Sequence, residues 1–219
     1  MTVKIDFHVH TDRSSDCIIV LRELAAKSRK LRIVPAITDH DSISAHEAMR
    51  SLRVDFIPGN EISTKMGDII GLYLTETVPP KLQLGEALDR VRAQGGLVCL
   101  PHMYDSRRNG LVPPTEYLAK IDLVEVFNAR CLAPSLNGRA ASFAEVNGKL
   151  GTVGTDSHFL FEFGSTYAEL PDFDLQDPRA LMKALPKAKL VTRRAPFFVR
   201  GMAKIARAGK KALGRLAGK

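Results

Sequence analysis

The chain has 219 residues, of which 45% are hydrophobic and 26% charged, so it can bury a substantial core and differs from a disulfide-stapled miniprotein or a disordered chain. Its formal net charge of +8 comes from one end, because residues 187–219 hold eleven Lys and Arg and no Asp or Glu, whereas the preceding residues are mildly acidic. The three cysteines lack CxxC spacing, which argues against a disulfide framework and a zinc knuckle.

The longest apolar runs, such as residues 68–74 and 96–101, are far shorter than the roughly 20 residues that cross a bilayer. The N-terminus leads directly into VKIDFH, without the basic, apolar and small-residue regions of a signal peptide. We therefore expect a cytoplasmic protein without a transmembrane helix.

Short β-rich apolar runs alternate with segments of helical period from residue 3 to about residue 170, a pattern typical of repeated β-α units. Strands are expected at residues 3–8, 33–38, 54–58, 68–74, 97–102, 123–128 and 152–155. Helices are expected at residues 18–31, 44–52, 84–93, 114–121 and 134–149. Residues 61–67 leave no room for a helix between two strands and predict a hairpin or a β-bulge. The pattern predicts an α/β protein with seven strands in a closed barrel, and a flavodoxin-like open sheet is the alternative.

Five of the six histidines lie at or just beyond the C-terminal ends of expected strands, namely His8, His10, His40, His102 and His158. Carboxylates follow the same edge at Asp16, Asp39, Asp41, Glu61, Glu125 and Asp156. Ligands and catalysis gather at this edge of parallel α/β folds. So many ionisable groups are costly to pack together unless cations lie between them. The sequence therefore predicts bound metal ions, with Asp39 and Asp41 orienting the ligating imidazoles.

Residues away from this edge carry no catalytic pattern. His46 lies in an expected helix and is interpreted as a solvated surface residue, and the three cysteines are interpreted as small hydrophobic residues. No GxSxG, Walker A or GxGxxG motif occurs, which argues against a serine hydrolase, a P-loop NTPase and a nucleotide-dependent dehydrogenase.

Several short motifs follow one another along residues 3 to about 170. They are DFHVHT at 6–11, ITDHD at 37–41, PGNEIS at 58–63, PH at 101–102, EVFN at 125–128 and GTDSH at 154–158. In this order they resemble the motifs of the PHP superfamily, named for polymerase and histidinol phosphatase. The resemblance implies a distorted, TIM-like seven-stranded β/α barrel, up to three divalent metals at the C-terminal strand ends, and phosphoesterase activity. We divide the chain into this barrel, residues 1–192, and a C-terminal helix or tail, residues 193–219.

The resemblance also implies three sets of metal ligands. The first metal would be held by His8, His10, Glu61 and Asp156. Glu61 would bridge to a second metal, which His102 also holds, and the third metal would be held by Asp16, His40 and His158. Near the sixth strand, relatives place a His, Cys or Glu ligand for the second metal. The candidates here are Glu125 and Asn128, and we favour Glu125 because Asn is a weak ligand for Mn, Fe or Zn.

Mixed His and carboxylate ligands suit Mn, Zn or Fe, so two or three such ions are the expected cofactors. Two ions can share a bridging hydroxide that attacks phosphorus, which needs no activated Ser or Cys. The predicted function is therefore a metal-dependent phosphoesterase (hydrolase, EC 3.1 type) acting on a small phosphorylated substrate. The alternatives are a nuclease or nucleotide phosphatase that acts on nucleic-acid ends, and a non-catalytic metal-binding barrel.

Catalytic roles at this centre are assigned to Glu61, Asp156 and His158. The transferred phosphate also needs a cationic clamp, and Arg suits it because its guanidinium can bind phosphate through two hydrogen bonds. The candidates are Arg107, Arg108 and Arg130, and Arg130 is preferred.

The tail predicts a basic amphipathic helix that begins near Pro196. Its apolar face would carry Phe198, Met202, Ile205, Gly209, Ala212 and Leu216. Its basic face would carry Arg200, Lys204, Arg207, Lys211 and Arg215. Either the apolar face covers the barrel, or the helix docks on an anionic membrane surface or on nucleic acid. No obligatory protein partner is inferred.

Overall fold

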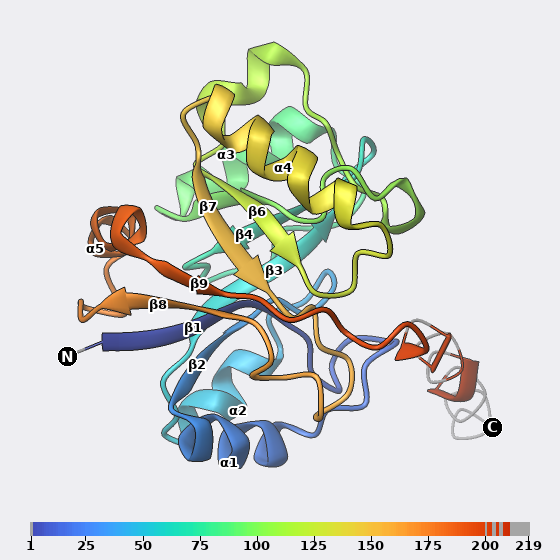
Figure 1. Cartoon of the computed structure of the whole chain (residues 1–219), viewed down its shortest axis with the longest axis vertical. Helices are drawn as coiled ribbons and strands as arrows, with labels where there is room; N and C mark the ends of the chain where they lie inside the picture. Colours follow the sequence, from blue (N-terminus) through green and yellow to red (C-terminus); the bar gives the residue numbers. More distant parts are fainter. Residues whose placement is uncertain (1, 200, 203–204, 206–207, 211–219) are drawn as a thin grey trace.

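The computed structural model describes residues 2–199, 201–202, 205 and 208–210 and contains one strongly curved sheet flanked by helices (Figure 1). The strands are β1 (Thr2–Val9), β2 (Ile33–Ile37), β3 (Ile57–Ser63), β4 (Asp68–Leu72), β5 (Leu97–Leu100), β6 (Leu123–Asn128), β7 (Leu150–Gly154), β8 (Tyr167–Pro171) and β9 (Lys189–Val191). The helices are α1 (Leu21–Leu31), α2 (Ala45–Ser51), α3 (Leu84–Ala93), α4 (Pro134–Val146) and α5 (Pro178–Ala184). The nine strands pair in the order β7-β6-β5-β4-β3-β2-β1-β8-β9.

The sheet curls until the chain just after β7 meets the end of β1. His10 N donates to Ser157 O at 3.2 Å, and Asp156 N donates to His8 O at 2.8 Å. Nearer the beginning of β1, the neighbour on this side is the antiparallel strand β8, in which Pro171 pairs with Thr2. The expected α/β architecture is thus present, but it is a nearly closed sheet of nine strands instead of a strict seven-stranded barrel.

Strand β4 is antiparallel to both β3 and β5, as a hairpin at residues 61–67 implies. The cause is the short connection before it, because a parallel pair needs a crossover of a dozen or more residues. The hairpin expected at residues 61–67 is confirmed. Strand β3 begins three residues later than expected and continues to Ser63, so Glu61 lies within the strand instead of after it.

The helices follow the predicted positions closely at α1, α2, α3 and α4. Helix α3 buries Leu84, Ala87, Leu88 and Val91, which recur at the spacing of one helix face. The expected helix at 114–121 is instead a 3-10 turn, Thr115–Lys120. Helix α5 and strand β9 were not predicted as separate elements.

Apolar residues of most strands and of α5 pack into one cluster away from the polar strand ends. This cluster joins Ile5 and Phe7 of β1 to Leu181 and Ala184 of α5. The three cysteines are free and buried, as expected for small hydrophobic residues. Among the described residues, no helix has the length and apolar character needed to cross a membrane.

Candidate metal centre

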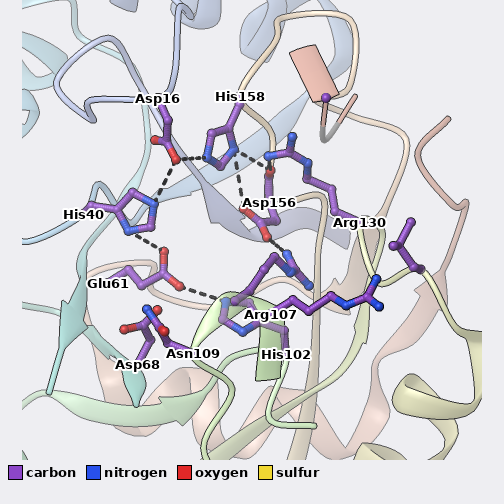
Figure 2. Close-up of a pocket in the computed structure, with 13 residues that line it drawn as sticks. Asp16, His40, Glu61, Asp68, His102, Arg107, Asn109, Arg130, Asp156 and His158 are labelled. Carbon is purple, nitrogen blue, oxygen red and sulfur yellow. Dashed lines mark hydrogen bonds and ion pairs between the residues drawn. The ribbon is translucent and has the colours of Figure 1, made fainter. Parts of the chain in front are cut away.

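Five histidines and their neighbouring carboxylates meet at the C-terminal ends of β1, β2, β5 and β7. Three of them, His40, His102 and His158, line a cavity of about 400 Å³ (Figure 2), and His8 and His10 are buried. The ring centroids of His10 and His40 are 4.5 Å apart, those of His10 and His158 are 4.4 Å apart, and those of His8 and His102 are 5.8 Å apart. The expected gathering of imidazoles at one edge of the sheet is therefore present in the structure.

Glu61 lies at the middle of this cluster, since its two carboxylate oxygens face different histidines. Its Oε1 lies 2.9 Å from His102 Nε2, whereas Oε2 lies 3.0 Å from His40 Nδ1 and 3.3 Å from His10 Nε2. Burial raises the pKa of Glu61, but the neighbouring His40 and His8 outweigh burial and hold that pKa well below its usual value. A central carboxylate whose two oxygens point in different directions has the form of a bridging ligand.

Asp156 and Asp16 extend the cluster on either side. Asp156 Oδ1 lies 3.3 Å from His10 Nε2 and 3.5 Å from His158 Nδ1. Asp16 Oδ2 lies 3.3 Å from His158 Nε2 and 3.6 Å from His40 Nε2. The residues that the family resemblance assigns to the first and third metals are thus brought together in space.

The backbone at the strand ends is shaped to bring these side chains together. Asp156 and His102 adopt left-handed φ angles of 52° and 30°, which non-glycine residues rarely adopt and which often occur at functional sites. Gly154 allows β7 to approach β1, because a Cβ atom there would lie only 2.4 Å from the Cβ of His8. The adjacent Thr155 donates from its N and Oγ1 atoms to the buried carboxylate of Asp6, at 2.9 and 2.5 Å.

Asp39 and Asp41 do not contact the imidazoles directly, which corrects the expectation that they orient them. Asp39 accepts hydrogen bonds from Thr11 and from Ser14 Oγ, the latter at 2.6 Å. Ser14 Oγ in turn lies 3.2 Å from His10 Nδ1, so Asp39 supports that ring only through a hydroxyl. Asp41 accepts from Ser63 N at 2.8 Å and ties the β3–β4 hairpin to the loop after β2.

Glu125, the predicted ligand on β6, lies behind His8 and His102. Its Oε1 is 3.1 Å from His8 Nδ1, and its Oε2 accepts from His102 N at 2.8 Å and from Asn128 Nδ2 at 2.9 Å. Asn128 is equally occupied, since its Oδ1 accepts from Arg108 and from Arg130 N. Both oxygens of Glu125 therefore hold ligands or backbone in position.

The three candidate arginines differ in their surroundings. Arg130 is buried and holds the backbone, donating to Asp156 O at 3.3 Å and to Val199 O at 3.1 Å. Arg108 forms an ion pair with the Asp156 carboxylate. Arg107 lines the cavity together with Arg108 and Arg130. The preferred clamp, Arg130, thus has backbone partners for two guanidinium nitrogens, whereas the Arg108 guanidinium contacts the side chains of Asp156, Asn128 and Asp105.

His46 is not a solvated surface residue, which corrects the sequence interpretation. Only 2% of it is exposed, and its Nε2 lies 3.0 Å from Gly59 O. The reason is that α2 turns this face toward β3, where the His46 ring packs against Phe56. Burial lowers the pKa of His46.

Sequence reasoning did not identify Asp68, which is the first residue of β4 and lines the cavity (Figure 2). It is buried, and its Oδ1 atom has no hydrogen-bond partner. Burial raises the pKa of Asp68 to about 7, and the neighbouring Glu61 adds to this effect. The only sequence signal was its place at the end of the hairpin that follows Glu61.

Divalent metals fit this donor set. His Nε2 or Nδ1 and carboxylate oxygens suit Zn, Mn and Fe(II). Groups of three ligand atoms within 4.8 Å of one another occur at His8, His10 and Glu61, and at His10, His40 and His158. Buried atoms without a hydrogen-bond partner include Asp16 Oδ1 and His102 Nδ1. Such orphaned polar atoms are rare in a folded protein, and they fit a site whose donors serve a cation.

The described part of the C-terminal tail runs beside this cavity. Ala195 N donates to Ala129 O at 2.8 Å, and Lys210 Nζ donates to Asp12 O and Ser14 O, each at 2.8 Å. Gly201 lines the cavity. The segment therefore spans from the loop after β6 to the loop after β1, which carries the predicted ligand Asp16.

The tail is helical at the described residues 199, 201–202, 205 and 208–210. Of the predicted apolar face, Ile205 is 73% exposed, Phe198 49% and Met202 36%, so only part of this face is buried. Gly209 is also exposed. The other predicted positions lie outside the described residues: Arg200, Lys204, Arg207, Lys211, Ala212, Arg215 and Leu216.

Comparison with known proteins gives one family and several similar folds. The family model described as PHP-associated matches residues 134–190. The chain is 39% identical over 184 residues to the uncharacterized protein MJ0417 of Methanocaldococcus jannaschii, and the match covers 80% of this chain and 74% of that protein.

Two solved structures illustrate the fold. A two-domain protein of Bacteroides vulgatus, which contains a predicted PHP-like metal-dependent phosphoesterase, matches 86% of this chain with a TM-score of 0.69 and 16% identity. The lesion-specific endonuclease PfuEndoQ of Pyrococcus furiosus matches 87% of this chain with a TM-score of 0.60 and 15% identity. This chain spans 65% of the first protein and 58% of the second, so both relatives contain additional parts.

Proposed function

This chain belongs to the PHP superfamily, as its motifs predicted, and from that premise we propose that it is a metal-dependent phosphoesterase, a hydrolase of the EC 3.1 type. The observation that carries the proposal is the position of Glu61, which faces His102 with one oxygen and His10 and His40 with the other. Such an arrangement suits two or more divalent ions that share one carboxylate.

The residues proposed to hold the ions are those that surround the cavity. One ion would take His8, His10, Glu61 and Asp156, a second would take Glu61 and His102, and a third would take Asp16, His40 and His158. Bound divalent ions supply Lewis acidity and lower the pKa of water into the neutral range. Mn, Zn and Fe(II) are the proposed candidates because the ligands are imidazoles and carboxylates.

The chain's own residues would orient the substrate. Arg107 and Arg108 line the cavity and offer guanidinium donors to phosphate oxygens. Arg130 would act indirectly, since its bonds to Asp156 O and Val199 O hold the cavity wall in place. Ser14 and Glu125 would position His10 and His8, which they contact through the ring nitrogen Nδ1.

A small phosphorylated compound is the proposed substrate class. A cavity of about 400 Å³ lies in the size range of sites for small molecules. The second candidate is a nuclease or nucleotide phosphatase that acts on nucleic-acid ends. It is favoured by the similar fold of the P. furiosus endonuclease and by the basic tail beside the cavity.

A partner for the tail is also proposed. Phe197 and Ile205 are strongly exposed, at 85% and 73%, within a segment that holds only basic charges. Apolar side chains among Lys and Arg favour an anionic lipid surface over nucleic acid, because a bilayer interface accepts both. The tail would then keep the cavity close to the membrane surface.

The test is a panel of phosphomonoesters and phosphodiesters, assayed with Mn, Zn and Fe(II) against the metal-depleted chain. We expect metal-dependent hydrolysis of small phosphomonoesters. The variant Asp55→Asn, at an exposed position, serves as a control with unchanged activity. Turnover of oligonucleotide ends only would favour the nuclease, and absence of turnover in the fully metal-loaded chain would favour a non-catalytic metal-binding barrel.

A further inference from the structure

We propose that Asp68 is the third protein ligand of the second metal, together with Glu61 and His102, and that its carboxylate makes Mn²⁺ compete better with Zn²⁺ at this site than a second imidazole would. The inference rests on the proposed metal centre and adds to it a residue that the family motifs do not include. It also assigns Glu125 a positioning role instead of a ligand role.

The first observation is the geometry of these three side chains. One ligand atom from each of Glu61, Asp68 and His102 lies within 4.8 Å of the others. All three line the cavity, and all three are buried. Figure 2 shows Asp68 below Glu61 and His102 to the right of the Glu61 carboxylate, to which a dashed line joins it. A cation at this point would be reached by two carboxylates and one imidazole.

The second observation is independent and concerns an unpartnered atom. Asp68 is only 4% exposed, yet its Oδ1 has no hydrogen-bond partner. A buried carboxylate oxygen without a donor costs free energy, because the solvation it had in water is not replaced. His102 Nδ1, on the ring that faces Glu61, also lacks a partner. A cation beside Asp68 Oδ1 would satisfy this oxygen.

The third observation is that the alternative ligands on β6 are already occupied. Glu125 uses Oε1 for His8 Nδ1 and Oε2 for His102 N and Asn128 Nδ2. Asn128 accepts from Arg108 with Oδ1, and its Nδ2 donates to Asp156 Oδ2 at 3.2 Å. The positive charge of Arg108 therefore lies next to the position where a ligand from β6 would have to reach a cation.

The backbone holds Asp68 in this position. Its N atom donates to Asn109 O at 2.9 Å, which ties the beginning of β4 to the loop after β5. Gly67 makes this approach feasible, because it has a φ angle of 144° and a Cβ atom there would lie 2.6 Å from Asn109 O. The hairpin and the β5 loop together aim the carboxylate toward Glu61 and His102.

The metal preference follows from the ligand types. Carboxylate and water ligands suit Mn²⁺, whereas imidazole and thiolate ligands suit Zn²⁺. With two carboxylates and one imidazole, the site offers more oxygen ligands than a site in which a second imidazole replaces one carboxylate. Replacing Asp68 by His should therefore keep a third ligand but raise the affinity for Zn²⁺ relative to that for Mn²⁺.

The experiment measures bound metal, not activity. The full chain is loaded with Mn²⁺, passed over a desalting column and analysed for Mn per chain, and Mn²⁺ affinity is measured by titration. Asp68→Asn, which keeps the side-chain volume, should lose one equivalent of Mn²⁺ or weaken its binding at least about tenfold. Glu125→Gln changes a side chain that positions His8 and His102, so it should lose less Mn²⁺ affinity than Asp68→Asn, and Asp55→Asn should match the wild type.

Asp68→His provides a second test in case Asp68→Asn folds poorly. We expect this variant to retain the wild-type number of ions and to show a higher ratio of Zn²⁺ to Mn²⁺ affinity than the wild type in a competition titration. The proposal is overturned if Asp68→Asn binds as many Mn²⁺ ions as the wild type with equal affinity, or if Glu125→Gln loses more Mn²⁺ than Asp68→Asn does. A wild type that binds the ions but hydrolyses no ester would instead refute the proposed function.

Discussion

Arg108 forms an ion pair with Asp156, so a permanent positive charge lies against a carboxylate that the family resemblance assigns to the first metal. The same guanidinium reaches Asn128 Oδ1 at 3.0 Å and Asp105 Oδ2 at 3.2 Å. Arg130, by contrast, spans from Asp156 O to Val199 O. These different partners allow the roles of the two arginines to be separated by substitution.

Replacing Arg108 by Gln is expected to reduce kcat/KM for a phosphomonoester about 10²-fold, because a charge that stabilises the developing negative charge is lost. Arg108→Lys should recover part of this loss, since it restores a charge but not the two-pronged geometry. Steady-state kinetics on all three chains measures this. Equal kcat/KM in Arg108→Gln and the wild type would show that this guanidinium does not meet the substrate.

Replacing Arg130 by Gln is expected to act mainly on stability. The side chain is buried, and its removal leaves Val199 O without this donor. Loss of such a bond costs about 1–3 kcal/mol, which corresponds to a decrease in Tm of several degrees for a chain of this size. Differential scanning calorimetry checks the shift. An unchanged Tm together with a large rise in KM would instead indicate that Arg130 binds the substrate phosphate.

Glu61→Gln is expected to decrease activity more than any other single substitution at the centre. It removes one negative charge from a side chain whose two oxygens face His102 on one side and His10 and His40 on the other. We expect loss of at least about 10²-fold in kcat, together with fewer bound ions. Kinetics and elemental analysis are measured on the same preparation. Retention of more than about a tenth of the wild-type rate would contradict the bridging assignment.

Metal affinity is expected to rise with pH. Burial lowers the pKa of His8, but the carboxylates of Asp156, Glu125 and Glu61 outweigh burial and raise that pKa well above its usual value. His40 behaves in the same way because of Glu61 and Asp16. In the metal-free chain both rings therefore carry a proton near neutral pH, and a metal must displace it. Titrations with Mn²⁺ at pH 6, 7 and 8 should show increasing affinity and release of about two protons per chain. Affinity that is independent of pH would contradict this prediction.

The stability of the metal-free chain should depend on pH in the opposite direction. A histidine whose folded pKa is raised stabilises the fold fully below its unfolded pKa of about 6.5, and this contribution is lost as pH rises through the folded pKa. Asp6 adds a change of the same sign, because burial raises its pKa to about 7. Burial lowers the pKa values of His102 and His158, which therefore change stability in the opposite direction near pH 6.5. Tm of the chelator-treated chain should fall from pH 7 to pH 8, where that opposing change is complete. A Tm that rises over this interval would contradict these protonation states.

The residues of the site were predictable from the sequence to different extents. His8 and His10 are two apart on an extended strand, so their shared direction follows from the period of a strand. The positions of His40 and His158 followed from the rule that strand ends meet at one edge. Asp68 could not be assigned in this way, because β4 runs antiparallel and it is the beginning of this strand that reaches the cavity.

His46 shows the same limit for helices. Its polarity suggested solvent, but the residue lies on the face of α2 that packs on β3, and its Nε2 finds a backbone carbonyl there. Glu125 was expected to be a ligand because its residue type is right. Which of its oxygens remain free depends on contacts with Asn128 and His102, which are three and 23 residues away along the chain. Such hydrogen-bond competition is set by tertiary packing and leaves no mark in the local sequence.

The tail prediction compares the full chain with a chain that ends at Thr192. We expect the full chain to bind vesicles that contain anionic lipid and the short chain to bind them much more weakly, because residues 193–219 supply basic charge together with exposed apolar side chains such as Phe197 and Ile205. Binding should weaken as salt is raised from low to physiological ionic strength.

A second variant separates docking from structure, because the truncation also removes the bonds of Ala195 N to Ala129 O and of Lys210 to Asp12 O. Phe197→Ser combined with Ile205→Ser changes two exposed side chains and leaves those bonds in place. This double variant should keep the wild-type Tm but lose affinity for anionic vesicles, since the apolar contribution to membrane binding is removed. RNA binding is measured in parallel. Equal vesicle binding by the double variant, the short chain and the wild type would refute membrane docking, and loss of RNA binding alone in the short chain would assign the tail to nucleic acid.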